Sequence, residues 1–171
     1  MRYFRTAAAC STIFLVLFMS REALSQETQQ EAPQKLYFDA KLGLTFWSGN
    51  GSTSGLLFGG GLDIPVDKNL YGRPELNITT LSGTPIELAA ALKYMIPNTL
   101  AATPLYVEGG PGLWFSSGGT SFTLDFGGGA IFALKGSNLS IPAEVKFGPI
   151  FASGSTIFQI TLSSGIRFAI P

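Results

Sequence analysis

From residue 36 onward, apolar and polar side chains alternate with a period of two residues. This period predicts β-strands, because successive side chains of a strand point to opposite faces. Turns rich in Gly, Ser, Asn and Pro divide the alternation into segments, as in a series of antiparallel hairpins. The segment 84–96 also fits a short helix when it is read alone, but its place in the repeating pattern favours a strand. We count eight predicted strands, at residues 36–47, 55–66, 70–80, 84–96, 104–115, 120–134, 139–151 and 155–170.

Two classes of side chain separate between the two faces of these strands. All 11 phenylalanines that follow the first 25 residues fall on the apolar face. All 12 charged side chains within the strands, seven acidic and five basic, fall on the other face, together with many Gly, Ala and Ser residues. Small residues and nearly equal numbers of both charges suit the interior of a narrow barrel. We therefore expect a structural ion-pair network in the lumen, formed by Asp39, Lys41, Asp63, Arg73, Glu75, Glu87, Lys93, Glu108, Asp125, Glu144, Lys146 and Arg167.

The alternation fits two inverted barrels. A soluble barrel would bury the phenylalanine face, whereas a membrane barrel would turn it to lipid and enclose the charges. The predicted turns contain only three charged residues, Asp67, Lys68 and Lys135, and a soluble barrel usually carries more surface charge. Each predicted strand is long enough to cross the hydrocarbon layer, and a closed barrel leaves no unpaired edge in lipid. The sequence therefore predicts an all-β fold: an eight-stranded antiparallel up-and-down transmembrane β-barrel.

The first 25 residues have the three parts of a secretory signal peptide. Basic residues near the start precede a mostly apolar run at 7–19, and the small residues of Ala-Leu-Ser at 23–25 precede a cleavage position. A membrane anchor is the alternative, but the apolar run is short for a transmembrane helix. Residues 26–35 are polar and are predicted to be a flexible periplasmic lead-in. The barrel domain is then expected at 36–171.

Three glycine-rich or aromatic strand sequences carry a family resemblance: YVEGGPGLWF at 106–115, LDFGGGAIFAL at 124–134 and FQITLSSGIRFAIP at 158–171. With the signal peptide and the eight alternating strands, they make the chain resemble the small bacterial outer-membrane barrel families of the OmpA-transmembrane and OmpX kind. Such families often end on an aromatic residue that the assembly machinery recognises, whereas here Phe168 is followed by Ala-Ile-Pro.

The resemblance implies a multi-pass β-barrel in the outer membrane of a Gram-negative cell. Its implied partners are the lipid bilayer and the barrel-assembly machinery, and we expect a monomer. The even number of predicted strands brings both termini to one side, which we expect to be the periplasm.

The expected function follows from the width of such a barrel. Eight strands enclose a space that side chains fill, so the physical expectation is a plugged polar lumen and a structural role in the envelope. Buried charges need partners, because an unpaired buried charge is strongly destabilising. The predicted register gives three ion pairs in the periplasmic half: Asp63 with Arg73, Lys93 with Glu108, and Asp39 with Arg167.

Two other binding functions fit parts of the pattern. A soluble periplasmic β-barrel would bind an apolar ligand in its interior. A narrow channel, or a carrier of small apolar molecules, would use space beside glycines of the charged face. Those glycines are Gly59, Gly61, Gly127 and Gly129.

An enzyme acting on lipid, such as a lipid A deacylase or acyltransferase, generally needs a serine that a histidine activates. The chain offers Ser140, Ser163 and Ser164, but it contains no histidine. We therefore expect no enzymatic activity. The formal net charge of zero and the absence of known motifs also indicate no cofactor, no metal site and no nucleic-acid partner.

Overall fold

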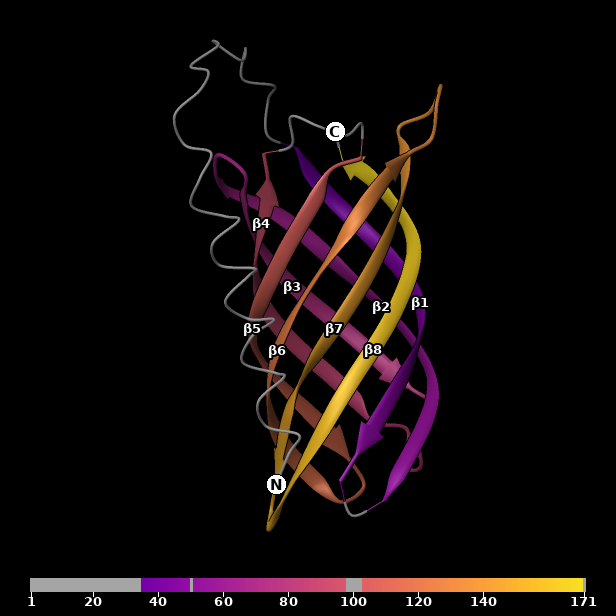
Figure 1. Cartoon of the computed structure of the whole chain (residues 1–171), viewed down its shortest axis with the longest axis vertical. Helices are drawn as coiled ribbons and strands as arrows, with labels where there is room; N and C mark the ends of the chain where they lie inside the picture. The colour runs from indigo at the N-terminus through magenta and orange to yellow at the C-terminus, as the bar shows by residue number, and fades with distance from the viewer. Residues whose placement is uncertain (1–34, 50, 98–102, 171) are drawn as a thin grey trace, which may run out of the picture. The chain divides into compact units, whose positions relative to one another are not determined.

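The computed structural model describes residues 35–49, 51–97 and 103–170, which form eight antiparallel strands in a closed barrel (Figure 1). Each strand pairs with its neighbours in the sequence, and the first strand closes the barrel on the last. The strands are β1 (Leu36–Ser48), β2 (Ser52–Asp67), β3 (Leu70–Thr79), β4 (Ile86–Ile96), β5 (Leu105–Ser116), β6 (Gly119–Ala133), β7 (Leu139–Ala152) and β8 (Ser155–Ile170).

The predicted all-β architecture is confirmed. The segment 84–96, for which a short helix was the alternative, contains the strand β4. β4 pairs with β3 on one side and with β5 on the other, so its place in the barrel decides its conformation. No helix among the described residues is long and apolar enough to cross a membrane. The predicted signal peptide, and all but the last residue of the predicted lead-in, lie outside the described residues.

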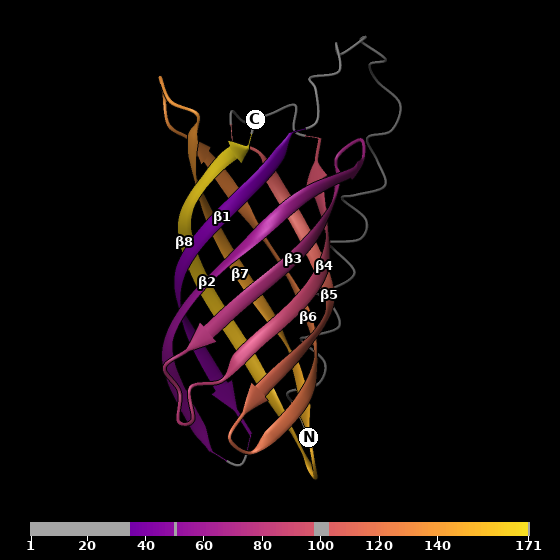
Figure 2. The same cartoon turned by 180° about the vertical axis from the view of Figure 1, so that it is seen from behind.

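The barrel has two distinct ends. Leu36 at the start of β1 pairs with Ile170 at the end of β8, so the described chain begins and ends at the same rim. We call this rim the terminal end and the opposite rim the distal end. The terminal end is uppermost in Figure 1, and Figure 2 shows from behind that the strands incline steeply around the barrel. Strands of 10 to 16 residues, inclined in this way, are long enough to cross a hydrocarbon layer.

Local sequence explains the tight turns at both ends. At the terminal end, Asn69 lies in the β2–β3 turn with a φ of 65°. At the distal end, Gly154 lies in the β7–β8 turn with a φ of 81°. Asn and Gly tolerate this left-handed backbone better than other residues, and hairpins with short loops require it.

The outer face of the barrel is apolar throughout its height. Ten of the 11 barrel phenylalanines are exposed, with accessible fractions between 38% and 50%, and Phe38 is half-buried against Phe168. The twelve charged residues predicted for the lumen are instead buried. The soluble-barrel alternative, which needs the phenylalanines inside, is therefore wrong. The faces are those of a transmembrane barrel.

This arrangement predicts a depth-dependent response to charge on the outer face. Phe126 lies at the middle of β6, whereas Phe132 lies beside its end. We expect Phe126→Arg to lower the free energy of unfolding by about 2–4 kcal/mol in lipid vesicles, and Phe132→Arg by about 0–1 kcal/mol. Urea titration of both variants in the same vesicles measures the difference. Equal losses for the two variants would contradict a bilayer-spanning orientation.

Candidate functional site

The charged residues predicted for the lumen all point inward, and the strand period places them there. They are at most 8% exposed, and they come from all eight strands. Ten of them join one continuous ion-pair network, with five acidic and five basic members. The other two, Glu87 and Asp125, lie apart from it.

Arg73 on β3 lies at the centre of the network. Its Nη1 is 2.5 Å from Asp39 Oδ2 and 2.5 Å from Asp63 Oδ1, on β1 and β2. Its Nε donates a hydrogen bond to Glu75, two residues along the same strand. A guanidinium group has several donors in a fixed plane, so a single arginine can link carboxylates from three strands. The arginine is 2% exposed, and these contacts are what make its burial tolerable.

Two further cations surround Asp63 near the terminal end. Lys93 Nζ lies 2.9 Å and Arg167 Nη1 lies 2.6 Å from Asp63 Oδ2. Each cation also lies against an aromatic ring, with Lys93 Nζ 3.9 Å from the Tyr106 centroid and Arg167 Cζ 4.1 Å from the Tyr37 centroid. The ring faces add cation–π attraction to the ion pairs, which is strongest where water is excluded.

The structure places two of the three predicted pairs in contact. Arg73 lies 2.5 Å from Asp63, and Arg167 Nη1 lies 3.7 Å from Asp39 Oδ2. The predicted pair of Lys93 with Glu108 is wrong, although the two residues are register partners on β4 and β5.

The error has a physical cause in the reach of the side chains. Lys93 turns to Asp63, whereas Glu108 Oε1 lies 2.7 Å from Lys146 Nζ on β7. In so narrow a barrel, long side chains cross the axis. Proximity on neighbouring strands therefore does not decide which charges meet.

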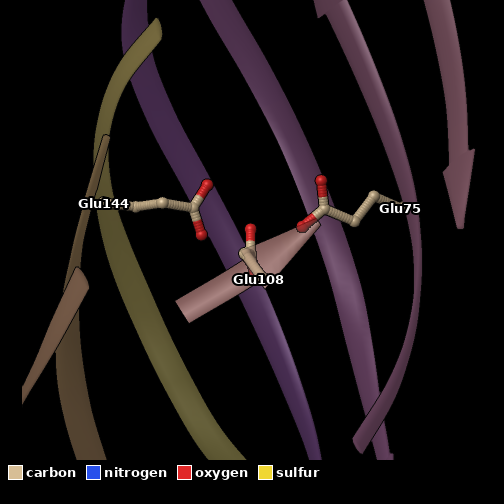
Figure 3. Close-up of side chains that lie close together, drawn as sticks. All are labelled: Glu75, Glu108 and Glu144. Atoms are coloured by element: carbon tan, nitrogen blue, oxygen red, sulfur yellow. The ribbon is translucent and has the colours of Figure 1, made fainter. Parts of the chain in front are cut away.

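Three glutamates converge in the middle of the lumen (Figure 3). Glu75, Glu108 and Glu144 come from β3, β5 and β7, and each offers a carboxylate oxygen within 4.8 Å of the others. Lys146 Nζ lies 2.6 Å from Glu75, 2.7 Å from Glu108 and 3.7 Å from Glu144. Lys41 Nζ lies 3.0 Å from Glu75 and 3.2 Å from Glu144. These ammonium groups take the place that a metal ion would need, so the three glutamates are held by lysines.

Small residues of the inner face make room for this network. A Cβ atom on Gly129 would lie 2.7 Å from the Tyr106 hydroxyl oxygen and 2.2 Å from the Ala143 carbonyl oxygen. The hydroxyl end of the tyrosine therefore lies against bare backbone, where it donates a 2.9 Å hydrogen bond to Glu144. Beside the network, a cavity of about 10 Å³ lined partly by Glu108, Asp125 and Lys146 has room for about one water molecule.

The distal end of the lumen is closed by apolar groups instead. Trp47 on β1 and Trp114 on β5 meet edge to face, with their ring centroids 5.1 Å apart. Leu57 and Ile150 are buried at the same end, each 2% exposed. Towards the distal end the ion-pair network therefore gives way to aromatic and aliphatic side chains, with Glu87 as the register partner of Trp114.

Sequence reasoning did not assign roles to the uncharged members of the lumen. Tyr106, Trp114, Asn77, Thr123 and Gln159 are each at most 3% exposed and contact other lumen residues. The signal that identifies them is positional. Each lies an even number of residues from a charged residue of the same strand and therefore shares its face. The two-residue period thus already placed these five residues inside the barrel.

Known proteins resemble this chain in structure alone. No family model and no curated protein matches the sequence. The crystal structure of Neisserial surface protein A superposes with a TM-score of 0.70 and 17% identity, covering 82% of this chain and 100% of that one. The N-terminal β-barrel domain of Pseudomonas aeruginosa OprF gives a TM-score of 0.52 and 11% identity, over 79% of this chain and 98% of that one.

A third similar structure is the outer membrane enzyme PagL. It gives a TM-score of 0.52 and 20% identity, covering 78% of this chain and 99% of that one. At these levels of identity the comparisons bear on the fold and not on activity. The chain thus has the fold of the eight-stranded outer-membrane β-barrels.

Proposed function

We propose that the protein is an integral β-barrel of the bacterial outer membrane whose lumen is plugged by its own side chains and whose role is structural, within the envelope. The observation that carries this proposal is the buried network of ten charges, which links the strands across the barrel axis. A permeating ion would have to displace cross-linked side chains from several strands. The apolar outer face supports insertion into lipid, and the charged side chains are enclosed in the lumen, where they pair with one another.

The proposed orientation places the terminal end in the periplasm. Both ends of the described barrel lie at that rim. We propose that residues 1–25 are a signal peptide and that residues 26–35 are a periplasmic lead-in. We also propose that the chain inserts as a monomer with the help of the barrel-assembly machinery. Closure supports the monomer, since β1 pairs with β8 and no strand edge is left for a second copy.

The carrier alternative has less support, because side chains already fill the space beside the interior glycines. A Cβ on Gly59 would lie 2.2 Å from Asn77 Oδ1, and one on Gly127 would lie 2.9 Å from Lys146 Cγ. Gly61 meets Glu75 and Gly129 meets Tyr106 in the same way. These glycines therefore accommodate the network rather than an apolar molecule.

We propose that the barrel is not an enzyme. PagL shares the fold and is an enzyme, so the fold does not decide the matter. The chain contains no histidine, so a serine nucleophile activated by histidine cannot form in it.

Membrane integration is tested by fractionation. We expect the protein to stay in the outer-membrane fraction after washing with urea or alkali, because its apolar face is solvated by lipid. The folded barrel should also migrate faster than the heated protein on a denaturing gel. A soluble periplasmic protein followed through the same washes serves as control. Release of the barrel by the washes would contradict the proposed location.

The network itself is tested by removing its central cation. We expect Arg73→Met to lower the free energy of unfolding by about 3–5 kcal/mol, because buried carboxylates then lose their partner. Lys135→Met, in the exposed β6–β7 turn, is the matched control and should change stability by no more than about 0.5 kcal/mol. Urea unfolding in vesicles measures both. Similar values for the two variants would mean that the network contributes little to folding.

The plugged lumen is tested by electrical recording. In planar bilayers we expect the wild-type protein to add no steady conductance, since ion pairs cross the lumen. Steady single-channel currents from wild-type protein would refute the plug and favour the narrow-channel alternative.

A further inference from the structure

Two lumen carboxyl groups lie outside the ion-pair network. Glu87 on β4 and Asp125 on β6 are 4% and 7% exposed. Both lie beside Thr123, since a Cβ on Gly112 would lie 2.7 Å from Thr123 Cγ2 and 3.3 Å from Glu87 Oε1, and the Thr123 hydroxyl lies 3.1 Å from Asp125 Oδ1. Neither forms an ion pair with any lysine or arginine of the described residues. The five basic lumen residues are already matched by five other acids, so this carboxyl pair leaves two formal negative charges in the lumen. A buried double charge without a counter-ion is not tolerated in a low-dielectric interior.

Uncharged polar side chains surround the carboxyl pair. Asn77 Nδ2 donates to Glu87 Oε2 at 2.7 Å, and Gln159 Nε2 donates to Asp125 Oδ1 at 2.5 Å. Thr123 Oγ1 donates to the same Asp125 oxygen at 3.1 Å. The carbonyl oxygens of Asn77 and Gln159 and the Oε1 of Glu87 are buried without a hydrogen-bond partner. Acceptor oxygens are thus in excess around a pair of acids.

The backbone is shaped to bring these groups together. A Cβ on Gly148 of β7 would lie 3.1 Å from Asp125 Oδ1, which is the atom that Gln159 reaches from β8. A Cβ on Gly112 of β5 would lie 3.3 Å from Glu87 Oε1. Bare backbone therefore lies under both carboxyls, and Gln159, which is 3% exposed, is aimed across β7 at one of them.

We propose that Glu87 and Asp125, with the side-chain carbonyls of Asn77 and Gln159, form a binding site for a hard divalent cation such as Ca²⁺ or Mg²⁺. Every donor is oxygen, which is the ligand type that these ions prefer. One divalent ion supplies the charge that the lumen lacks. Rotation of each terminal amide by half a turn presents its oxygen in place of its nitrogen, and this rotation requires no backbone movement.

The three central glutamates differ from this site in their counter-ions. There Lys146 and Lys41 already supply positive charge at ion-pair distances. At Glu87 and Asp125 no protein cation does so among the described residues. The two acidic groups thus differ in what neutralises them.

The two tryptophans of the chain provide a built-in probe of this site. Trp114 is the register partner of Glu87, and Trp47 is the register partner of Gln159. Excited tryptophan transfers energy to a terbium ion only when the ion is bound nearby, and Tb³⁺ occupies oxygen-rich Ca²⁺ sites. We expect the folded, full-length protein in detergent, after treatment with EDTA, to give saturable tryptophan-sensitised Tb³⁺ emission. Added Ca²⁺ should displace the emission.

Conservative variants assign the emission to the carboxyl pair. Glu87→Gln and Asp125→Asn keep side-chain size and remove one charge each, so the affinity for Tb³⁺ should fall by about tenfold or more. Asp67→Asn, at the end of β2 and exposed, is the matched control and should leave the emission unchanged. Heat-modifiable migration checks that each variant is folded before it is titrated.

A second measurement uses the wild-type protein alone, in case a variant fails to fold. Ca²⁺ should raise the unfolding temperature, and EDTA should reverse the rise. Absence of sensitised emission from the folded wild-type barrel overturns the proposal, as does emission that both variants retain in full. Stability that responds to pH and not to Ca²⁺ also overturns it, since the carboxyl pair would then hold a shared proton.

Discussion

The burial of charged side chains in the lumen determines how the interior of this barrel is built. Because side chains alternate along each strand of a closed barrel, every side chain points either to the outer apolar face or into the lumen. The charged side chains go inward, where the dielectric is low and an unmatched charge is costly. The sequence must therefore supply partners, and it does so with nearly equal numbers of acids and bases. The rest of the interior, including its glycines and the buried Tyr106, follows from fitting those partners into a narrow space.

The lumen satisfies this constraint differently along its height. Near the terminal end, Arg73 links carboxylates from three strands, and aromatic rings cover two other cations. In the middle, ammonium groups hold three glutamates. Towards the distal end, the ion-pair network gives way to the tryptophan pair, which lies across the lumen beside Glu87. The ion pairs therefore link the strands mainly in the terminal and middle parts of the lumen.

Much of the fold could be predicted because the period of two acts on every strand at once. The number of strands, their approximate bounds and the direction of each charged side chain all follow from it. Pairing inside the lumen does not, as Lys93 and Glu108 illustrate. They are register partners, yet Lys93 reaches Asp63 and Glu108 meets Lys146. Strand register follows from the order and length of the strands. Contact across the barrel axis depends instead on the length of each side chain and on its position along the axis.

The carboxyl pair shows that the net charge of the chain differs from the charge balance inside the lumen. The chain as a whole has a formal charge of zero, which hides a lumen with two more acids than bases. Exposed charges elsewhere, such as Lys135 in the β6–β7 turn, cannot neutralise Glu87 and Asp125, because solvent screens an exposed charge. Neutralisation has to be local, by a bound cation or a proton. A barrel whose ion-pair network is complete without these two acids can therefore respond to its ionic surroundings while the network stays intact.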